Sequence, residues 1–130
     1  MSQPNFIHLR LHTEFSLEDG TVRINELVDR AVEYGMPAVA VTDWCNLFGW
    51  VKFYKRAVAA GIKPICGADL LISHDDKTDD YGAMTLLVQN AEGYRNLCQL
   101  ISKSFLKGRN ALGRPLIHLS WLQRHHEGLI

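Results

Sequence analysis

Cysteine is scarce in this chain: there are three, Cys45, Cys66 and Cys98, and no two of them form a Cys-x-x-Cys pair. An odd number of widely spaced cysteines argues against a disulfide framework or a cysteine zinc site and favours buried thiols in a reducing compartment. The chain also lacks a run of ~20 apolar residues that could cross a membrane, and its first residues lack the basic flank and apolar core of a signal peptide. We therefore predict a cytoplasmic protein that makes no membrane contact.

A net charge is also missing, since 14 lysines and arginines balance 14 aspartates and glutamates. Without a general positive field, only a local patch of basic residues could hold a polyanion, so we do not predict DNA binding by these residues alone. A chain of 130 residues, of which 47% are hydrophobic, can bury one small core. The sequence therefore predicts one folding unit.

Strand-like and helix-like apolar patterns alternate along the first half of the chain. The run at 38–42 is apolar up to Thr42, which is typical of a strand buried on both faces of a parallel sheet. Gly35 and Pro37 end the first helix, and Gly61 ends the second. We predict a strand at 7–11, a helix at 24–32, a strand at 38–42, a helix at 48–60 and a strand at 62–72 that Gly67 interrupts. This alternation is typical of parallel βαβ units.

A charged stretch at 73–82 opens the second half and is too polar to pack. It predicts a surface loop that joins two strands, at 70–72 and 84–88, into a β-hairpin. The aspartates of this loop lack the spacing, the central glycine and the closing glutamate of a calcium loop. We therefore do not predict calcium binding.

A third amphipathic helix is predicted at 91–106, and the basic stretch at 107–116 favours a solvated connector over a phosphate contact. Ser120 is a good N-cap for a short helix at 121–126. Residues 128–130 have the pattern of the start of a strand, which implies a continuation of the fold past them. The late histidines lack ligand spacing on one helix face and are predicted to be surface residues: His118, His125 and His126.

The opening of the chain carries the strongest chemical signal, because an arginine stands where a metal site would need a histidine. In His8-Leu9-Arg10-Leu11-His12 the alternation places Arg10 and His12 on one face of the predicted strand, near its carboxyl end. Imidazole at both positions could bind a metal ion through neutral nitrogen atoms. Arginine cannot, since its guanidinium stays protonated and has no lone pair to donate.

Four ordered motifs, at 8–20, 40–49, 61–69 and 90–104, resemble one known family. They are similar to the PHP (polymerase and histidinol phosphatase) domain of the DNA polymerase III alpha subunits, the bacterial replicative polymerases. The resemblance implies an α/β fold, namely the first half of a distorted parallel β/α barrel with one β-hairpin. Residues 1–130 would then be the N-terminal portion of a PHP domain, with the polymerase domains outside them.

In metal-containing members of the wider family, this fold holds a trinuclear metal site for phosphoester hydrolysis. The resemblance places the ligand positions at Arg10, His12, Asp19, Trp44, Asp69 and Ala83. Arginine, tryptophan and alanine cannot ligate at three of them, and Asp69 is one methylene shorter than the family's glutamate. The resemblance therefore implies no metal, no cofactor site and no catalytic residue in this segment, with magnesium only at the polymerase site outside it.

Arg10 suggests a further hypothesis, that a fixed guanidinium takes the place of the metal and neutralises nearby carboxylates. Ordinary structural roles stay open for the other positions. His12 fits a hydrogen-bonded core histidine equally well, and Asp19 fits a turn. Asp43 and Asn46 fit caps of the next helix.

The resemblance implies that the parent protein is a DNA-directed DNA polymerase of chromosome replication, which contacts DNA through its other domains. For this segment it favours a non-catalytic scaffold that docks the separate proofreading exonuclease subunit and other replicase subunits. Trp50 and Phe53 are candidates for that surface if they are not core residues. The alternative is an active metal-dependent phosphoesterase or 3′–5′ exonuclease, since His12, Asp19 and Asp69 retain ligand chemistry. A free-standing small phosphatase is disfavoured by the polymerase-type motifs.

Overall fold

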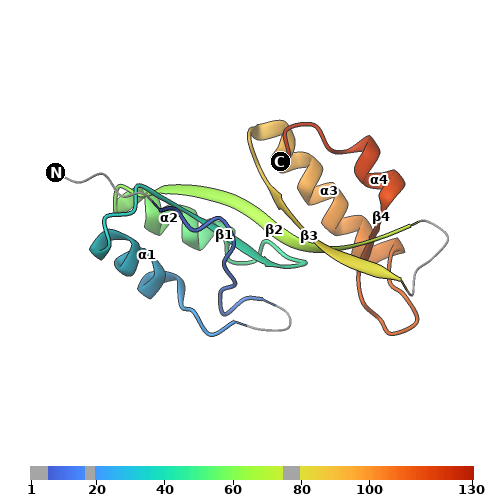
Figure 1. Cartoon of the computed structure of the whole chain (residues 1–130), viewed down its shortest axis with the longest axis horizontal. Helices are drawn as coiled ribbons and strands as arrows, with labels where there is room; N and C mark the ends of the chain where they lie inside the picture. The colour runs from blue at the N-terminus through green and yellow to red at the C-terminus, as the bar shows by residue number, and fades with distance from the viewer. Residues whose placement is uncertain (1–5, 17–19, 75–79) are drawn as a thin grey trace. The chain divides into compact units, whose positions relative to one another are not determined.

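The computed structural model describes residues 6–16, 20–74 and 80–130 (Figure 1). These residues divide into two compact units, of which the first ends at Ala68 and the second begins at Asp69. The predicted single folding unit thus has two parts. Within the described ranges, no helix is long and apolar enough to cross a membrane.

The first unit consists of α1 (Ile24–Glu33), β1 (Ala38–Trp44), α2 (Trp50–Ala59) and the first part of β2 (Lys63–Ser73). These elements confirm the predicted order of helices and strands. The predicted interruption at Gly67 is wrong, because β2 runs unbroken past this buried glycine. The core of the unit is made of apolar residues from α1, β1, α2 and the turn before β2: Ile24, Leu27, Val28, Ala31, Val39, Val41, Phe53, Ala57 and Ile62.

Glycines end both helices of the first unit, as predicted. Gly35 follows α1 with a φ of 70°, and Gly61 follows α2 with a φ of 78°. This left-handed backbone has little steric cost for glycine and is disfavoured for other residues. The second helix starts at Trp50, two residues later than predicted, because Gly49 holds the N-cap position.

The predicted strand at 7–11 is wrong, since these residues form no regular strand. The segment is nevertheless tied to β1, because Ala40 N donates to His8 O at 2.9 Å and Thr42 N donates to Leu11 O at 2.8 Å. The amide of Leu11 donates to the side-chain Oγ1 of Thr42, at 2.9 Å, instead of to a backbone carbonyl. A side chain thus takes the place of a ladder partner, which a sequence pattern cannot reveal.

The second unit contains the rest of β2, then β3 (Tyr81–Leu87), α3 (Ala91–Lys107), β4 (Leu116–His118) and α4 (Leu119–Arg124). The strand order is β1-β2-β3, and β4 pairs with β2 in parallel through Leu71 and Leu116. Neighbouring β2 and β3 confirm the predicted hairpin, while its polar residues 75–79 lie outside the described ranges. The sheet is thus partly parallel, in agreement with the predicted α/β class.

The end of the second unit differs from the prediction at α4. The helix begins at Leu119, with His118 in the N-cap position, so Ser120 lies inside the helix and is not its cap. Residues 128–130 form no regular strand, but they pair with the end of β3 and with the residue after it, as the strand-like pattern suggests. Leu87 and Ile130 exchange backbone hydrogen bonds of 2.8 and 2.9 Å, and Val88 and Leu129 form an antiparallel bridge.

Candidate functional site

Three of the six predicted ligand positions are described in the first unit, and the side chain of Trp44 contacts the other two. The guanidinium carbon of Arg10 lies 6.0 Å from the ring centre of Trp44. The ring centres of His12 and Trp44 are 5.5 Å apart, with planes tilted by 46°. A guanidinium at this distance from an indole face makes a cation–π contact. We call Arg10, His12 and Trp44 the Arg–Trp–His stack.

Asp43 fixes the backbone next to this stack. It is buried, with 2% of its surface exposed, and accepts hydrogen bonds from Thr13 N at 2.5 Å and from Thr13 Oγ1 at 2.7 Å. These bonds join the residue after His12 to the residue before Trp44, so the two rings are held from both chain segments. The prediction that Asp43 caps the next helix is therefore wrong.

Asn46 also binds across the turn instead of capping α2. Its Nδ2 donates to Phe15 O at 2.8 Å and to Trp44 O at 3.1 Å, while Oδ1 accepts from Phe48 N at 3.1 Å. Gly49 is the N-cap residue, so the predicted cap role of Asn46 is wrong as well. A buried amide with three partners holds this loop in one conformation.

Two further ligand positions lie in the second unit, and Asp19 lies outside the described residues. Asp69 is on β2, with 1% of its surface exposed, and accepts a hydrogen bond from the hydroxyl of Thr85 on β3. Ala83 is exposed on β3. The Thr85 contact was not predicted, since only the pairing of β2 with β3 brings the two residues together.

The described side chains do not fit a trinuclear metal site. In the Arg–Trp–His stack only His12 has a lone pair for a metal ion. Across the described ranges, no three histidine, cysteine, aspartate or glutamate side chains come together. Trp44 lies against the imidazole of His12, and Arg10 brings a fixed positive charge. No step of metal-assisted hydrolysis can be assigned to these residues.

The late histidines also contribute no ligand set. His118 stacks on Trp121, with ring centres 4.3 Å apart and planes at 4°. Nδ1 of His126 lies 2.9 Å from Gln123 O. His118 and His125 are half-buried, whereas His126 is exposed, so the surface prediction is right for only one of the three.

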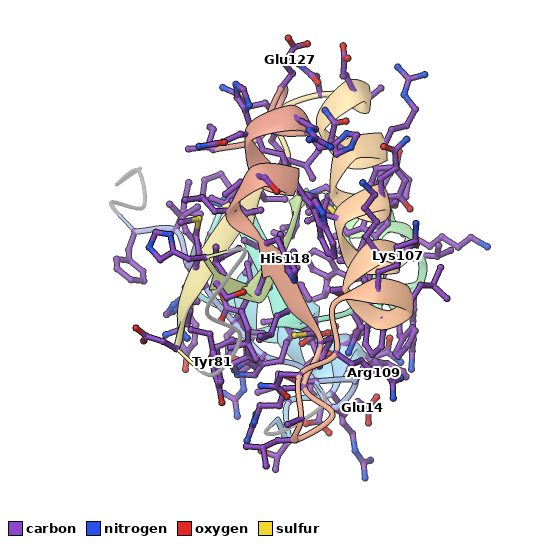
Figure 2. The ribbon with its side chains drawn as sticks, turned by 90° about the vertical axis from the view of Figure 1, so that its right-hand side faces the viewer. Glu14, Tyr81, Lys107, Arg109, His118 and Glu127 are labelled. Atoms are coloured by element: carbon purple, nitrogen blue, oxygen red, sulfur yellow. The ribbon has the colours of Figure 1, made fainter. Side chains whose placement is uncertain are left out.

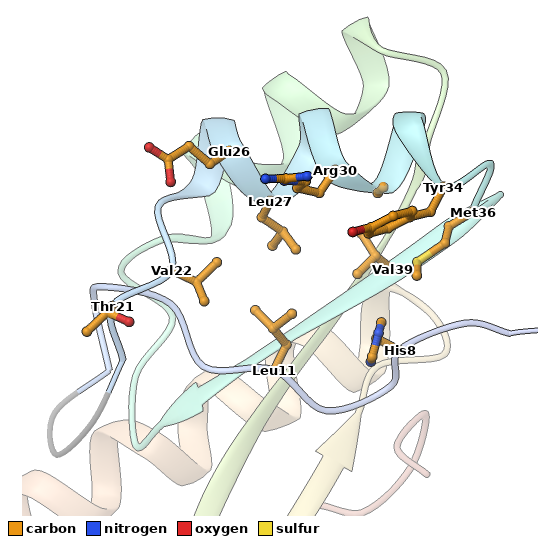
Figure 3. A pocket seen from close by; sticks show the side chains of 11 residues that line it. His8, Leu11, Thr21, Val22, Glu26, Leu27, Arg30, Tyr34, Met36 and Val39 are labelled. Carbon is orange, nitrogen blue, oxygen red and sulfur yellow. The ribbon is translucent and has the colours of Figure 1, made fainter.

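A pocket of about 420 Å³ lies in the first unit, between α1, β1 and the segment before the stack (Figure 3). Buried Leu27, Ala31 and Val39 are among its apolar wall residues. The other lining residues are His8, Leu11, Thr21, Val22, Glu26, Arg30, Tyr34 and Met36. A volume of this size, with an apolar wall and a few polar groups, is typical of binding pockets. No sequence motif predicts it, because its residues come from three separate segments.

The two predicted docking aromatics do not form this pocket. Phe53 is fully buried in the core of the first unit. Trp50 is half-buried, and its ring lies 6.0 Å from that of Phe53 and 5.7 Å from that of Tyr54. Phe53 is therefore a core residue and not a docking residue.

Known proteins place the chain in a family. The PHP domain family matches residues 8–130. The sequence is 54% identical to DNA polymerase III subunit alpha of Pseudomonas fluorescens over 97% of this chain, and 47% identical to that of Escherichia coli K12 over 100% of it. The subunit alpha of Vibrio cholerae is also 47% identical over 100% of the chain. The chain spans 11% of the length of each of these relatives.

Solved structures agree with this fold. A protein assigned as a metal-dependent phosphoesterase, from Bifidobacterium adolescentis, has a TM-score of 0.56 at 19% identity, over 81% of this chain and 35% of its own. An amidohydrolase from Chromobacterium violaceum has a TM-score of 0.57 at 21% identity, over 77% of this chain and 33% of its own. At these identities the likeness shows the fold alone, of which the chain covers a part. The chain therefore belongs to the PHP domain family, in a sequence form that matches DNA polymerase III subunit alpha.

Proposed function

We propose that this chain is a non-catalytic scaffold segment of a replicase alpha subunit, and that it docks the separate proofreading exonuclease subunit. The observation that carries the proposal is the Arg–Trp–His stack, which puts a guanidinium and an indole at two positions where the fold would need metal donors. The parent protein would be a DNA-directed DNA polymerase, with magnesium at its polymerase site and DNA bound by its other domains.

The charge of Arg10 and the bulk of Trp44 both argue against phosphoester hydrolysis by this segment. The guanidinium of Arg10 repels a metal cation brought near it. Trp44 fills space beside His12, and its indole has no lone pair that could bind a metal ion. Water activation between two metal ions needs several donors held around them, and the described side chains do not supply that set.

The pocket beside α1 is the part of the first unit that fits a docking role. His8 and Leu11 line it and flank Arg10 in the same segment, so the stack and the pocket share one stretch of chain. Its apolar wall suits an apolar side chain of the exonuclease subunit, and Glu26 and Arg30 at its polar side suit the backbone and charges around that side chain.

The test uses the full-length polypeptide that carries this segment, purified without chelators. Elemental analysis of this polypeptide should find no stoichiometric zinc or manganese. Adding either metal should not produce phosphodiesterase activity. The exonuclease subunit should bind and co-elute with it during size-exclusion chromatography. Absence of any complex with the exonuclease subunit would contradict the docking proposal.

A matched pair of variants locates the docking site. Val22→Asp places a charge in the wall of the pocket, where 37% of the valine surface is exposed, and should weaken the complex at least tenfold. Val58→Asp makes the same chemical change on exposed α2, outside the pocket, and should leave binding unchanged. Equal effects of both changes would remove the pocket from the proposal.

The alternative function is a metal-dependent phosphoesterase or 3′–5′ exonuclease built into the polymerase chain. His12 and Asp69 keep the chemistry that this function would need, although Asp69 is occupied by the hydroxyl of Thr85. Bound metal together with hydrolysis that His12→Ala abolishes would favour this alternative. In that case the stack would tolerate a metal ion, and the scaffold proposal would fail.

A further inference from the structure

Positive charge is concentrated in the last third of this neutral chain. Residues 91–130 contain six lysines and arginines but only two acidic residues, Glu92 and Glu127. The chain is neutral overall but has a local excess of basic residues in this part. A local basic patch is what contact with a polyanion would require in a neutral chain.

The basic residues gather at one end of α3. Lys103 and Lys107 lie one helical turn apart near the carboxyl end of α3, and Arg109 follows in the next loop (Figure 2). Glu92 is in the first turn of α3, and the backbone oxygen of Glu127 accepts from the side chain of Asn96 at 2.8 Å. At 1.5 Å per residue, Glu92 and Lys107 are about 22 Å apart along the helix. The two acids therefore do not neutralise the basic end.

The loop after α3 holds its basic residues in a fixed turn. Oδ1 of Asn110 accepts hydrogen bonds of 3.0 Å from the amides of Leu112 and Arg114. A Cβ on Gly108 would come within 2.0 Å of Leu116 O, so only glycine allows this close approach. The backbone of Arg109 pairs with that of Pro115. The predicted solvated connector is thus a hydrogen-bonded turn that sets the positions of two arginines.

The half-buried aromatic rings at this end already contact other side chains. Nζ of Lys103 lies 5.3 Å from the ring centre of Trp121, whose ring also stacks on His118. The guanidinium carbon of Arg109 lies 5.5 Å from the ring centre of Phe105. Protein partners draw most of their binding energy from open apolar or aromatic pockets, and these rings do not offer one. Besides the exposed aliphatic side chains of Leu106 and Leu112, what is accessible at this end is positive charge.

We propose that Lys103, Lys107, Arg109 and Arg114, here called the basic face, bind the phosphodiester backbone of a nucleic acid strand without reading its bases. Among the described residues, no carboxylate pairs with Lys103, Lys107 or Arg109, so their charges are available to phosphate oxygens. Ammonium and guanidinium groups both bind phosphate, and backbone contacts of this kind are independent of sequence. The inference is independent of exonuclease docking and of the Arg–Trp–His stack.

Fluorescence anisotropy with a labelled single-stranded oligothymidylate tests the basic face on this chain. Lys107→Ala combined with Arg109→Ala changes two exposed side chains, so circular dichroism should show an unchanged fold. The affinity at low salt should fall about tenfold, and the slope of log K against log salt should lose about 1.4, since each single-strand phosphate contact contributes about 0.7. Lys55→Ala combined with Lys63→Ala removes the same charge from exposed positions of the first unit and should leave both values unchanged.

Three results would overturn the inference. The first is an unchanged affinity in the Lys107→Ala, Arg109→Ala variant, and the second is an equal loss in the control variant. The third is displacement of the oligonucleotide by polyglutamate of equal charge at equal concentration, which would mark the face as a site for acidic protein. A photoactivated 5-iodouracil oligonucleotide gives an independent measurement on the full-length polypeptide, and its cross-link should map to α3 or to the loop after it. Cross-links to this segment that fall only elsewhere would also contradict the proposal.

Discussion

At the scale of single residues, the contact between Thr13 and Asp43 stabilises the first unit around the Arg–Trp–His stack. Both residues are buried, and the carboxylate accepts from both the amide and the hydroxyl of the threonine. Buried donors that lose such a partner keep their desolvation cost without compensation. This pair therefore determines how firmly the segment before α1 is held to the end of β1.

We predict that Asp43→Ala lowers the free energy of unfolding by about 2 to 3 kcal/mol, because two buried donors of Thr13 lose a charged acceptor. Urea unfolding followed by circular dichroism measures the change. Asp29→Ala is the control, since Asp29 pairs with Arg56 at the surface, and such pairs contribute about 0 to 1 kcal/mol. A loss as small as that of the control would show that the Thr13 contact contributes little.

A second prediction concerns the Arg–Trp–His stack itself. Arg10→His alone should not give stoichiometric zinc binding, because Trp44 still lies against His12. Arg10→His with Trp44→His should bind zinc, since two imidazoles on one zinc ion at Zn–N of about 2.0 Å have ring centres roughly 5 Å apart, close to the 5.5 Å between His12 and Trp44. Isothermal titration calorimetry distinguishes the two variants. Tight binding by the single variant would contradict the blocking role of Trp44.

The sequence could identify the residues at the ligand positions but not the contacts that they make. Residue chemistry alone excludes Arg10 and Trp44 as metal ligands. Their contact with each other depends on how residues 8–13 lie against β1. The hypothesis that Arg10 neutralises carboxylates stays a prediction. The bonds from Thr13 to Asp43 join positions 30 apart in the chain, and no local pattern marks such a pair.

At the scale of elements, periodicity predicted most helices and strands because each buries one face or lies wholly in the core. The strand predicted at 7–11 is missing because the side chain of Thr42 replaces a backbone partner there, and Ser120 is no cap because α4 already begins at Leu119. The beginning of α3 shows a different constraint, which comes from two glycines. Gly93 is buried in α3 against Gly128, and Asn90 caps the helix by accepting from Gly93 N at 3.0 Å.

We predict that Gly93→Ala destabilises the second unit by about 1 to 3 kcal/mol, the range for overpacking a tight contact. A Cβ at this position would lie 1.9 Å from Gly128 O, so the end of the chain must move. Without this contact, replacing a helical glycine by alanine would stabilise the helix by about 0.5 to 1 kcal/mol. Thermal unfolding therefore distinguishes the two effects, because the tight contact lowers the melting temperature whereas helix propensity alone would raise it. Gly82→Ala meets nothing within 4 Å and should leave the melting temperature nearly unchanged.

The start of α1 offers a stabilising change. Arg23 is the N-cap residue, its backbone is extended, and its side chain makes no capping hydrogen bond. Arg23→Ser should raise the free energy of unfolding by about 0.5 to 1 kcal/mol, because serine can accept from the amide of Glu26 and Glu26 can bond back. Arg23→Ala removes the same charge without adding a cap and should not stabilise. Equal urea midpoints for the two variants would contradict the capping argument.

At the scale of the whole molecule, exposed apolar side chains follow one face of α2. Val51, Tyr54 and Val58 are 59%, 50% and 53% exposed, at the spacing of one helix face. Contiguous exposed apolar surface promotes association. We therefore expect the isolated segment to associate with itself.

Sedimentation velocity over a wide concentration range should therefore show an average mass that rises with concentration. Val51→Lys combined with Val58→Lys should shift the chain toward monomer, because it puts two charges on that face. Leu106→Lys is a control at an exposed apolar residue on α3 and should have a smaller effect. A monomer at every concentration would contradict the expectation.

The Arg–Trp–His stack also has a consequence for the paths that evolution could take through this sequence. A chain that regained a histidine at Arg10 would lose a cation–π contact and gain no metal ion while Trp44 remains. A change at Trp44 alone would leave the guanidinium beside the one imidazole. Neither single substitution would thus restore metal binding. Selection for hydrolysis could not favour either one alone, so under our proposal the loss of the metal centre is effectively irreversible.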